Sequence, residues 1–362
     1  MASIYQKIDL FKALVTGNPA YADPVFVTLD ITRRCNFSCL ACSYHSPEVY
    51  ARNPVMSDMP VEMARSIAEQ LRPSHTRSVV IEGSGEPFCH PDVLEIVRIY
   101  KELGFRVTIL TNGSLLDEKM IRRLIDLKTD IMKVSLWAGT EKAFIQHYPG
   151  VPSRYFKTIL KNMLLISRLK KQTGAKRPSV WIHHPLSKHN FNAIPEMVEL
   201  AYRHHCDGIT FAPLIYYEGI STAHYPSQSD NHAIRQTLRS IRGMLRARGL
   251  HSNLDQILLR LRIGPHIWEK VPCYFVWTHA RIRGDGLIYP CCRCDIPLGN
   301  VKDHSFDVVW TGETYQRLRM KVITKQGLES FQSECDCRYC FHVQDSVRIH
   351  RFIAPLIRKK DV

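Results

Sequence analysis

Six short runs of apolar and β-branched residues, separated by helical patterns, constrain the fold of this chain most. The runs are Val25–Ile31, Ser78–Gly83, Arg106–Thr111, Ile131–Leu136, Ser179–Leu186 and Gly208–Leu214. Each is apolar enough to be covered on both faces, as parallel strands between helices are. Amphipathic stretches such as Asp92–Leu103 lie between them. This alternation favours a parallel α/β sheet or barrel, and six units are fewer than the eight of a complete TIM barrel. We therefore predict an incomplete (β/α)6 barrel.

The pattern changes after about residue 252. Trp277–Tyr289 predicts a β-hairpin around residues 284–286, which read Gly-Asp-Gly. Phe306–Ile323 predicts a helix, and a cysteine-rich stretch follows it. We therefore expect three parts: an N-terminal helical extension (residues 1–23), a partial barrel (24–251) and a small α+β domain with a basic tail (252–362).

Twelve cysteines in 362 residues need an explanation. No run approaches the roughly 18 consecutive apolar residues of a membrane helix. The first 21 residues lack the basic, apolar and small-residue regions of a signal peptide, so we expect a cytoplasmic protein. In a reducing compartment, metal ligation or redox chemistry explains clustered cysteines better than disulfides do.

Three of these cysteines lie together in RCNFSCLAC, directly after the first predicted strand. Cys35, Cys39 and Cys42 can hold three corners of a 4Fe–4S cluster, which normally takes four cysteine ligands. A cluster held by three leaves one iron open, and an open position is typical of a catalytic metal site. A zinc loop is the alternative, although zinc motifs usually pair two C-x2-C halves.

Three further motifs follow the next strands in order. GSGEP occupies Gly83–Pro87, TNG occupies Thr111–Gly113 and VSLWAG occupies Val134–Gly139. With the cysteine trio, they resemble the signature of the radical S-adenosylmethionine (SAM) superfamily over residues 24–214. The resemblance implies that SAM binds the open iron and is reductively cleaved. The resulting 5′-deoxyadenosyl radical then abstracts a substrate hydrogen.

The same resemblance implies a set of cofactor-binding residues at the ends of the strands. Gly85 and Glu86 would hold the methionyl amine of SAM, and Asn112 and Ser135 would bond its ribose hydroxyls. Two positions depart from the family pattern. Ala41 stands where the family often has a bulky residue near the adenine, and Tyr44 or His45 is a substitute. Ser84 replaces the first glycine of GGEP, which should matter little if the contacts there are main-chain.

A second cysteine group lies near the C-terminus. Cys273 and Cys291 flank the predicted hairpin, and Cys337-x2-Cys340 follows the predicted helix. This arrangement resembles the "twitch" version of the SPASM domain found in 2-deoxy-scyllo-inosamine dehydrogenase-like enzymes. It implies that these four cysteines bind one auxiliary 4Fe–4S cluster. A zinc site with four cysteine ligands is the alternative. Three spare cysteines can each replace an assigned ligand: Cys292, Cys294 and Cys335.

A fully ligated auxiliary cluster cannot bind SAM, so the resemblance implies that it transfers electrons. A substrate radical that passes its electron to the cluster is oxidised by two electrons in total. The architecture therefore favours dehydrogenation or oxidative cross-linking. A flavodoxin or ferredoxin is the expected electron donor.

The charge of the chain is a weaker signal. The net charge is +15, and residues 153–177 carry eight cations and no acid. An anionic partner would explain them, but Phe156, Ile159 and Met163 form an apolar stripe that favours a solvated outer helix face. No RNA-binding signature accompanies the charge, so we do not expect a nucleic-acid or membrane partner. The oligomeric state is left open.

Two shorter patterns also give predictions. His183 and His184 lie on the fifth strand, so alternation turns one of them into the barrel, where it can bind substrate or act as a base. Ile8, Phe11 and Leu14, with Ile4, form an amphipathic set that we expect to dock on the barrel.

The sequence predicts a radical SAM enzyme that oxidises a small polar metabolite, such as a sugar, aminocyclitol or nucleoside intermediate. A maturase for a ribosomally made peptide is the alternative, and it is less favoured because we expect no separate peptide-recognition domain before the first strand. A non-catalytic iron–sulfur or zinc carrier would not need GSGEP, TNG and VSLWAG. A tRNA-modifying enzyme is a further alternative, and only the net charge of the chain supports it. No catalytic residue is assigned.

Overall fold

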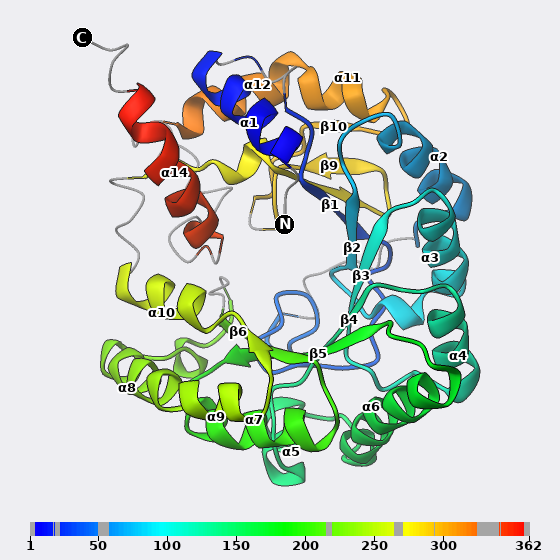
Figure 1. Cartoon of the computed structure of the whole chain (residues 1–362), viewed down its shortest axis with the longest axis vertical. Helices are drawn as coiled ribbons and strands as arrows, with labels where there is room; N and C mark the ends of the chain where they lie inside the picture. The colour runs from blue at the N-terminus through cyan, green and yellow to red at the C-terminus, as the bar shows by residue number, and fades with distance from the viewer. Residues whose placement is uncertain are drawn as a thin grey trace.

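The core of the computed structural model is one ten-stranded sheet that curves into an open barrel (Figure 1). The structure describes residues 4–16, 18, 22–49, 58–214, 219–263, 271–292, 294–323, 340 and 342–357. The strands are β1 (Phe26–Asp30), β2 (Ser78–Glu82), β3 (Arg106–Thr111), β4 (Ile131–Ser135), β5 (Ser179–Leu186), β6 (Gly208–Pro213), β7 (His251–Ser252), β8 (His279–Arg283), β9 (Leu287–Tyr289) and β10 (Gly299–Asn300). The six predicted strands are all present, and the predicted α/β barrel is confirmed.

The strand order places the C-terminal strands beside the first one. The order is β10-β9-β8-β1-β2-β3-β4-β5-β6-β7. Neighbours from β8 through β7 run parallel, and the β8–β9 and β9–β10 pairs are antiparallel. In register, Asp30 lies opposite Glu82, and Thr28 lies opposite Arg281. The parallel β1–β8 pair extends the barrel with a strand from the predicted C-terminal domain. The predicted boundary at residue 252 stays a prediction.

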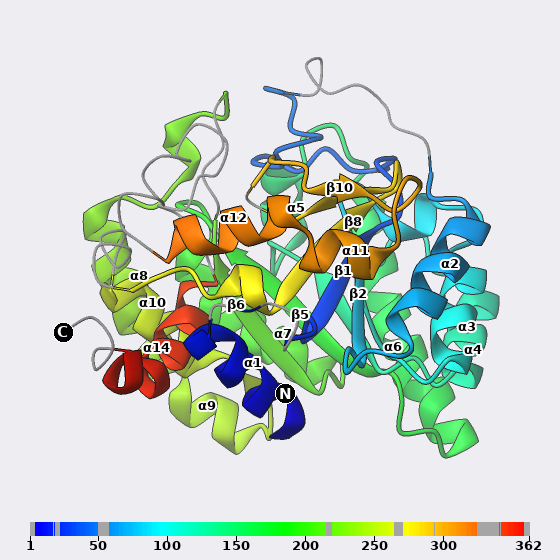
Figure 2. The same cartoon turned by 90° about the horizontal axis from the view of Figure 1, so that it is seen from above.

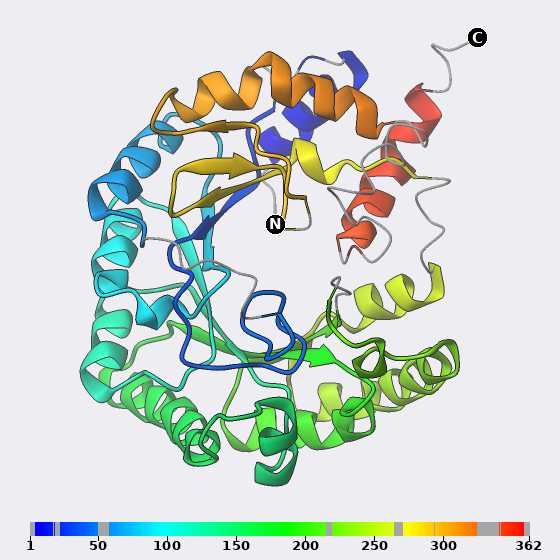
Figure 3. The same ribbon diagram turned by 180° about the vertical axis from the view of Figure 1, so that it is seen from behind.

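Helices cover the outside of the barrel (Figures 1 and 3). They are α1 (Ile4–Thr16), α2 (Val61–Leu71), α3 (Val93–Glu102), α4 (Glu118–Asp126), α5 (Glu141–His147), α6 (Arg154–Thr173), α7 (Ile194–Arg203), α8 (Gln228–Ser240), α9 (Arg242–Ala247), α10 (Leu254–Ile263), α11 (Phe306–Thr311), α12 (Glu313–Val322) and α14 (Val343–Ile357). Single 3-10 turns are η3 (Pro87–Cys89), η4 (Phe191–Ala193), η5 (Thr222–His224) and η7 (Phe275–Trp277). Among the described residues, no helix is long and apolar enough to cross a membrane.

Helix α6 shows how the sequence sets this arrangement. Ile159 and Met163 are each only 1% exposed, and Phe156 is buried with them. The cations of the helix lie on its other faces, and Gly174 ends it in the left-handed conformation at φ +68°. The predicted solvated basic face is therefore confirmed.

Helix α14 fills the gap in the ring between the two ends of the sheet, where it contacts both α1 and α10 (Figure 1). Leu14 of α1 is buried, as predicted. Ile8 and Phe11 are 46% and 38% exposed. The predicted docking stripe is therefore wrong for these two residues, because Ala13 and Leu14 supply the buried face instead.

Strands β8, β9 and β10 of the C-terminal part lie beside β1 in the sheet (Figure 2). Strands β8 and β9 form the predicted hairpin, with Gly286 at φ +88° in its turn. The helix predicted over residues 306–323 is two helices, α11 and α12. Gly312 separates them in an extended conformation, where an added Cβ would lie 2.7 Å from the Val308 carbonyl oxygen. Trp310 Nε1 donates to the Ala22 carbonyl at 2.7 Å and ties α11 to the segment before β1.

The two histidines of β5 face opposite sides, as alternation predicts. His183 lies on the interior face and is partly exposed, whereas His184 is completely buried on the helix-covered face. His184 Nδ1 lies 2.9 Å from the Leu136 carbonyl, so Nδ1 carries the proton. Burial lowers the pKa of His184 to about 4.

This burial predicts acid sensitivity. The folded-state pKa of His184 lies below the ordinary value of 6.5. The contribution of His184 to the free energy of unfolding is therefore fully present above pH 6.5 and is lost as the pH falls toward 4. One pH unit below 6.5, we expect a loss of about 1.4 kcal/mol of unfolding free energy from this residue. Urea unfolding between about pH 7 and pH 5.5 checks this. A His184→Asn variant should lose about one proton of pH dependence relative to the wild type. A variant slope equal to the wild-type slope would contradict the assignment.

Candidate active site

The loop that follows β1 carries Cys35, Cys39 and Cys42 across one mouth of the barrel (Figure 3). A turn brings the last two together, because the Cys42 amide donates to the Cys39 carbonyl at 3.1 Å. The Phe37 amide donates to Cys35 Sγ and the His45 amide donates to Cys42 Sγ, both at 3.4 Å. Amide donors to sulfur stabilise thiolates and tune iron–sulfur clusters.

The chemistry of these thiols fits a bound cation. Burial raises the pKa of Cys35 to about 12, and it raises the pKa of Cys39 well above its ordinary value. The neighbouring thiols raise both values further, because a negative charge on one sulfur disfavours a negative charge on the next. Among the described residues, no group of His, Cys, Asp or Glu surrounds a single ion position. In a 4Fe–4S cluster each cysteine binds a different iron, so the three thiols of this loop can hold three irons of one cluster.

Helix α5 and the segment after it hold the cysteine loop in place. The Leu40 amide donates to the His147 carbonyl at 2.9 Å. Ser38 Oγ donates to the Pro149 carbonyl. The Phe37 ring lies 5.9 Å from Phe144, 5.3 Å from Tyr148 and 5.6 Å from Tyr155 between centroids. The loop is thus fixed by aromatic packing as well as by hydrogen bonds.

Gly85 of GSGEP lies against the backbone of the cysteine loop. An added Cβ would lie 2.3 Å from the Arg34 carbonyl oxygen and 2.7 Å from the Arg33 carbonyl carbon. The next amide, that of Glu86, donates to the same Arg34 oxygen at 2.9 Å. Position 85 must therefore lack a side chain for the two segments to meet.

A Gly85→Ala substitution is expected to displace the cysteine loop. We expect lower iron content after reconstitution and roughly tenfold weaker SAM binding, measured by equilibrium dialysis under anaerobic conditions. Gly243→Ala is the matched control, because Gly243 lies within α9 and an added Cβ meets nothing within 4 Å. A Gly85→Ala protein with wild-type iron content and SAM affinity would show that the close contact is not needed.

The Glu86 carboxylate connects GSGEP to TNG. Its Oε1 accepts from the Phe88 amide at 3.1 Å and from Thr111 Oγ1 at 2.6 Å. Its Oε2 accepts from the Asn112 amide at 2.6 Å. Burial raises the pKa of Glu86 to about 7, against the opposing effect of these donors. The sequence reasoning missed this connecting role, and contact with the methionyl amine stays a prediction.

Asn112 in turn connects TNG to the cysteine loop. Asn112 Nδ2 donates to Asn36 Oδ1 at 2.9 Å, and Asn36 Nδ2 donates to Ser114 Oγ at 2.8 Å. Asn112 Oδ1 accepts from the Ser114 amide and hydroxyl at 2.9 and 2.7 Å. Ser135 ends β4 and is partly exposed; its hydroxyl has no protein partner among the described residues. The ribose contacts of both residues stay predictions.

Ser84, the departure from GGEP, joins a buried ion pair. Asp30 at the end of β1 accepts from the Ser84 amide at 2.9 Å and from its hydroxyl at 2.7 Å. Arg281 of β8 forms an ion pair with Asp30 and also donates to Ser84 Oγ at 3.0 Å and Tyr44 OH at 3.4 Å. The Ser84 side chain thus links GSGEP to the C-terminal part. The expectation that Ser84 matters little where the cofactor contacts are main-chain stays a prediction.

The predicted auxiliary ligands are described in part. Cys273 and Cys340 are buried, and burial together with the Cys273 thiol raises the pKa of Cys340 to about 12. Cys291 is half-buried, whereas Cys337 and the spare Cys335 lie outside the described residues.

Two other spare cysteines are described. Cys292 Sγ lies 4.0 Å from His342 Nε2. Cys294 is buried and disulfide-bonded. The proximity of Cys273 to Cys340 agrees with their joint assignment, and the complete ligand set stays a prediction.

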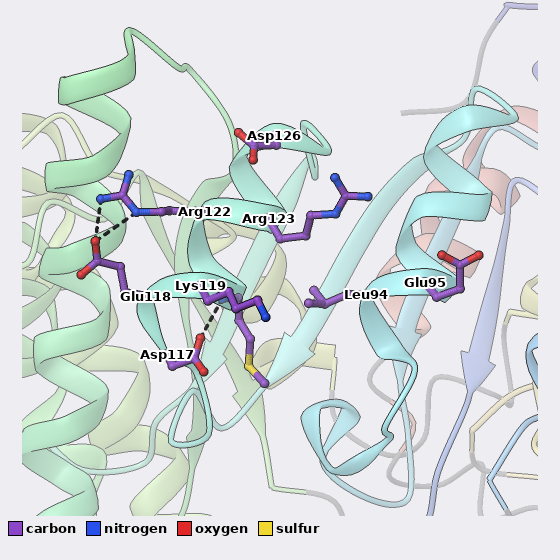
Figure 4. A pocket seen from close by; sticks show the side chains of 9 residues that line it. Leu94, Glu95, Asp117, Glu118, Lys119, Arg122, Arg123 and Asp126 are labelled. Atoms are coloured by element: carbon purple, nitrogen blue, oxygen red, sulfur yellow. Dashed lines mark hydrogen bonds and ion pairs between the residues drawn. The ribbon is translucent and has the colours of Figure 1, made fainter.

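A groove of about 860 Å³ lies elsewhere, between α3 and α4 on the outside of the barrel (Figure 4). Its lining consists of Leu94, Glu95, Asp117, Glu118, Lys119, Met120, Arg122, Arg123 and Asp126. Arg122 forms an ion pair with Glu118 at 2.5 Å, and Asp117 caps α4 through the Met120 amide at 2.7 Å. The groove has no cysteine or histidine, and it lies apart from the cysteine loop.

Comparison with known protein families shows the family to which the chain belongs. Residues 29–201 match the radical SAM superfamily, and residues 273–341 match the SPASM iron–sulfur cluster-binding domain. This chain is a radical SAM enzyme with a SPASM domain. Its cofactors are SAM and 4Fe–4S clusters, and the predicted family is confirmed. The radical SAM match spans the cysteine loop, GSGEP, TNG and VSLWAG.

Curated relatives resemble most of this radical SAM enzyme. A tungsten-containing aldehyde ferredoxin oxidoreductase cofactor-modifying protein of Pyrococcus furiosus is 25% identical over 86% of this chain and 87% of that protein. An AdoMet-dependent heme synthase of Methanosarcina barkeri is 22% identical over 87% of this chain and 91% of that protein.

Solved structures share the fold. SuiB of Streptococcus suis bound to S-adenosylmethionine has a TM-score of 0.64 at 18% identity, over 82% of this chain and 68% of SuiB. The structure of anSMEcpe with bound AdoMet has a TM-score of 0.64 at 16% identity, over 93% of this chain and 97% of that one. At these identities the likeness shows the fold alone.

Proposed function

We propose that this enzyme oxidises a small polar metabolite by hydrogen abstraction, with electron transfer through the SPASM domain. The observation that carries the proposal is the single hydrogen-bonded unit formed by the cysteine loop, GSGEP and TNG at the carboxyl ends of β1–β3. Active sites of barrel enzymes lie at this face. When bound there, the cluster and SAM supply an electron and a 5′-deoxyadenosyl radical.

The protein residues hold and orient these cofactors. Cys35, Cys39 and Cys42 are the proposed ligands of the SAM-binding cluster. Glu86 fixes the Asn112 segment through its buried carboxylate, and Asn112 fixes the cysteine loop through Asn36. Because each of these polar groups is already engaged, the site is pre-ordered before cofactors bind.

The polar interior of the barrel supports a small polar substrate. Inward-facing positions of β2–β6 include Glu82, Thr108, Lys133, His183 and Thr210, all partly exposed. Alternate residues on the same strands are buried against the helices. The names of the curated relatives, a cofactor-modifying protein and a heme synthase, support a non-peptide substrate.

The SPASM domain supports oxidation. Cys273, Cys291, Cys337 and Cys340 are the proposed ligands of one auxiliary cluster, which would accept the electron of the substrate radical. Strand β8, which begins the described hairpin, pairs directly with β1 before the cysteine loop. This pairing supports electron transfer between the two domains. A flavodoxin or ferredoxin is the proposed electron donor.

Extract fractionation tests the substrate class. The enzyme, reconstituted anaerobically and supplied with SAM and reductant, is mixed with fractions of a cell extract, and 5′-deoxyadenosine is measured. We expect a low-mass, protease-resistant fraction to increase its formation. Stimulation confined to a protease-sensitive fraction would overturn the metabolite assignment in favour of a peptide substrate. A solved SuiB structure holds such a precursor peptide.

A further inference from the structure

The interior of the barrel holds two opposite charges that form no ion pair with each other. Glu82 ends β2, and Lys133 lies in the middle of β4, with β3 between them in the sheet. The two side chains interact electrostatically across the interior. No ion pair or hydrogen bond of either side chain occurs within the described part of the chain.

Both side chains lie on the interior face of the barrel and are partly exposed. Burial raises the pKa of Glu82 and lowers the pKa of Lys133, so the surroundings disfavour both charges. Among the described residues, some side-chain nitrogen and oxygen atoms are fully buried without a hydrogen-bond partner, and none of these atoms belongs to Glu82 or Lys133. Their terminal atoms therefore keep contact with solvent inside the barrel. A carboxylate and an ammonium in this position need a ligand to compensate the lost hydration.

The other titratable groups that face this space are Asp30, Arg281 and His183. Arg281 lowers the pKa of Glu82 and Asp30 raises it, and these two residues form their own buried ion pair, with side chains 1% (Asp30) and 6% (Arg281) exposed. His183 Nδ1 lies 3.1 Å from Thr210 Oγ1, and that hydroxyl donates to the Ile182 carbonyl at 3.4 Å. His183 therefore carries its proton on Nδ1, and burial lowers its pKa to about 3. It is neutral at pH 7 and presents a hydrogen-bond acceptor, Nε2.

We propose that Glu82 and Lys133 bind a zwitterionic group of the substrate, with an ammonium on Glu82 and a carboxylate on Lys133. This inference rests on the proposed function, because it places the substrate inside the barrel. A purely anionic ligand would leave Glu82 uncompensated, and a purely cationic one would leave Lys133 uncompensated. One molecule that carries both charges satisfies both groups. The neutral His183 adds a hydrogen bond without changing the charge balance.

Matched probes test the charge pattern without knowledge of the substrate. Binding of glycine, β-alanine and γ-aminobutyrate to the anaerobic SAM-loaded enzyme is measured by ligand-observed NMR and compared with butyrate and butylamine. We expect at least one zwitterion to bind roughly tenfold more tightly than either singly charged probe. No advantage for any zwitterion would overturn the proposal, and so would competition between the zwitterions and SAM.

Two variants test which residue binds the ammonium and which binds the carboxylate of the ligand. Lys133→Met should abolish the advantage over butylamine, and Glu82→Gln should abolish the advantage over butyrate. Lys119→Met, in the groove outside the barrel, is the control and should leave both advantages intact. SAM binding by each variant shows that it has folded. An advantage that survives in both interior variants would contradict the assignment.

This binding test is independent of SAM cleavage. If no 5′-deoxyadenosine forms while the zwitterion preference stands, the proposed function fails and the binding site remains. If SAM is cleaved and the preference is absent, only the zwitterion assignment fails.

Discussion

A Cys39→Ala variant is expected to lose about four irons per chain and to form no 5′-deoxyadenosine above background. Cys39 is central in the trio, and the other two thiols lie within electrostatic reach of it. With two ligands left, the cluster has no stable three-point attachment and no defined open iron. Iron and sulfide analysis of the anaerobically reconstituted protein, together with product analysis, measures both effects.

The matched control is Cys206→Ala. Cys206 is buried, and its Sγ lies 3.8 Å from Met163 Sδ, away from both cysteine groups. This variant should keep wild-type iron content and SAM cleavage. A Cys39→Ala protein with unchanged iron content and product formation would show that the trio does not hold the SAM-binding cluster.

The second large effect is expected from Arg281→Met. Arg281 pairs with Asp30 in the buried contact between β8 and β1, and the variant leaves the Asp30 carboxylate without its cation. Breaking one side of a buried ion pair costs about 3–5 kcal/mol of unfolding free energy. Urea unfolding at pH 7 measures this loss.

A second substitution and a surface control separate charge from packing. Asp30→Asn in the Arg281→Met background removes the stranded charge and keeps an acceptor for the Ser84 amide, so most of the stability should return. Arg317 and Glu313 form an ion pair on the surface of α12, with side chains 73% and 76% exposed. Arg317→Met should therefore cost less than about 1 kcal/mol. Equal losses for Arg281→Met and Arg317→Met would contradict the buried-pair assignment.

Local patterns predicted the elements that carry the chemistry. The cysteine trio lies within eight residues, and each later motif lies at or directly after the carboxyl end of a strand, so position along the chain implied position at the barrel mouth. Alternation on β5 predicted opposite directions for His183 and His184, because neighbouring residues of a strand point to opposite faces.

Contacts between distant segments gave no sequence signal. Asp30 and Arg281 are 251 positions apart, and no local pattern pairs a carboxylate with one particular arginine among so many. The connecting role of Glu86 was hidden for another reason. The family resemblance assigns the motif to the cofactor, whereas the carboxylate itself bonds Thr111 and the Asn112 amide.

The apolar pattern of α1 gave a wrong prediction for two side chains. Ile8 and Phe11 have the spacing of a buried stripe, but the helix turns Ala13 and Leu14 toward the protein instead. A short amphipathic set fixes which residues share a helix face, and it does not fix which face meets a neighbour.

The most direct test of the account is 5′-deoxyadenosine formation by the reconstituted wild-type enzyme with SAM and a strong reductant. The account predicts product that requires both SAM and reductant, and more product when the low-mass extract fraction is added. Absence of product with and without extract, from protein that has its clusters filled and binds SAM, would contradict it.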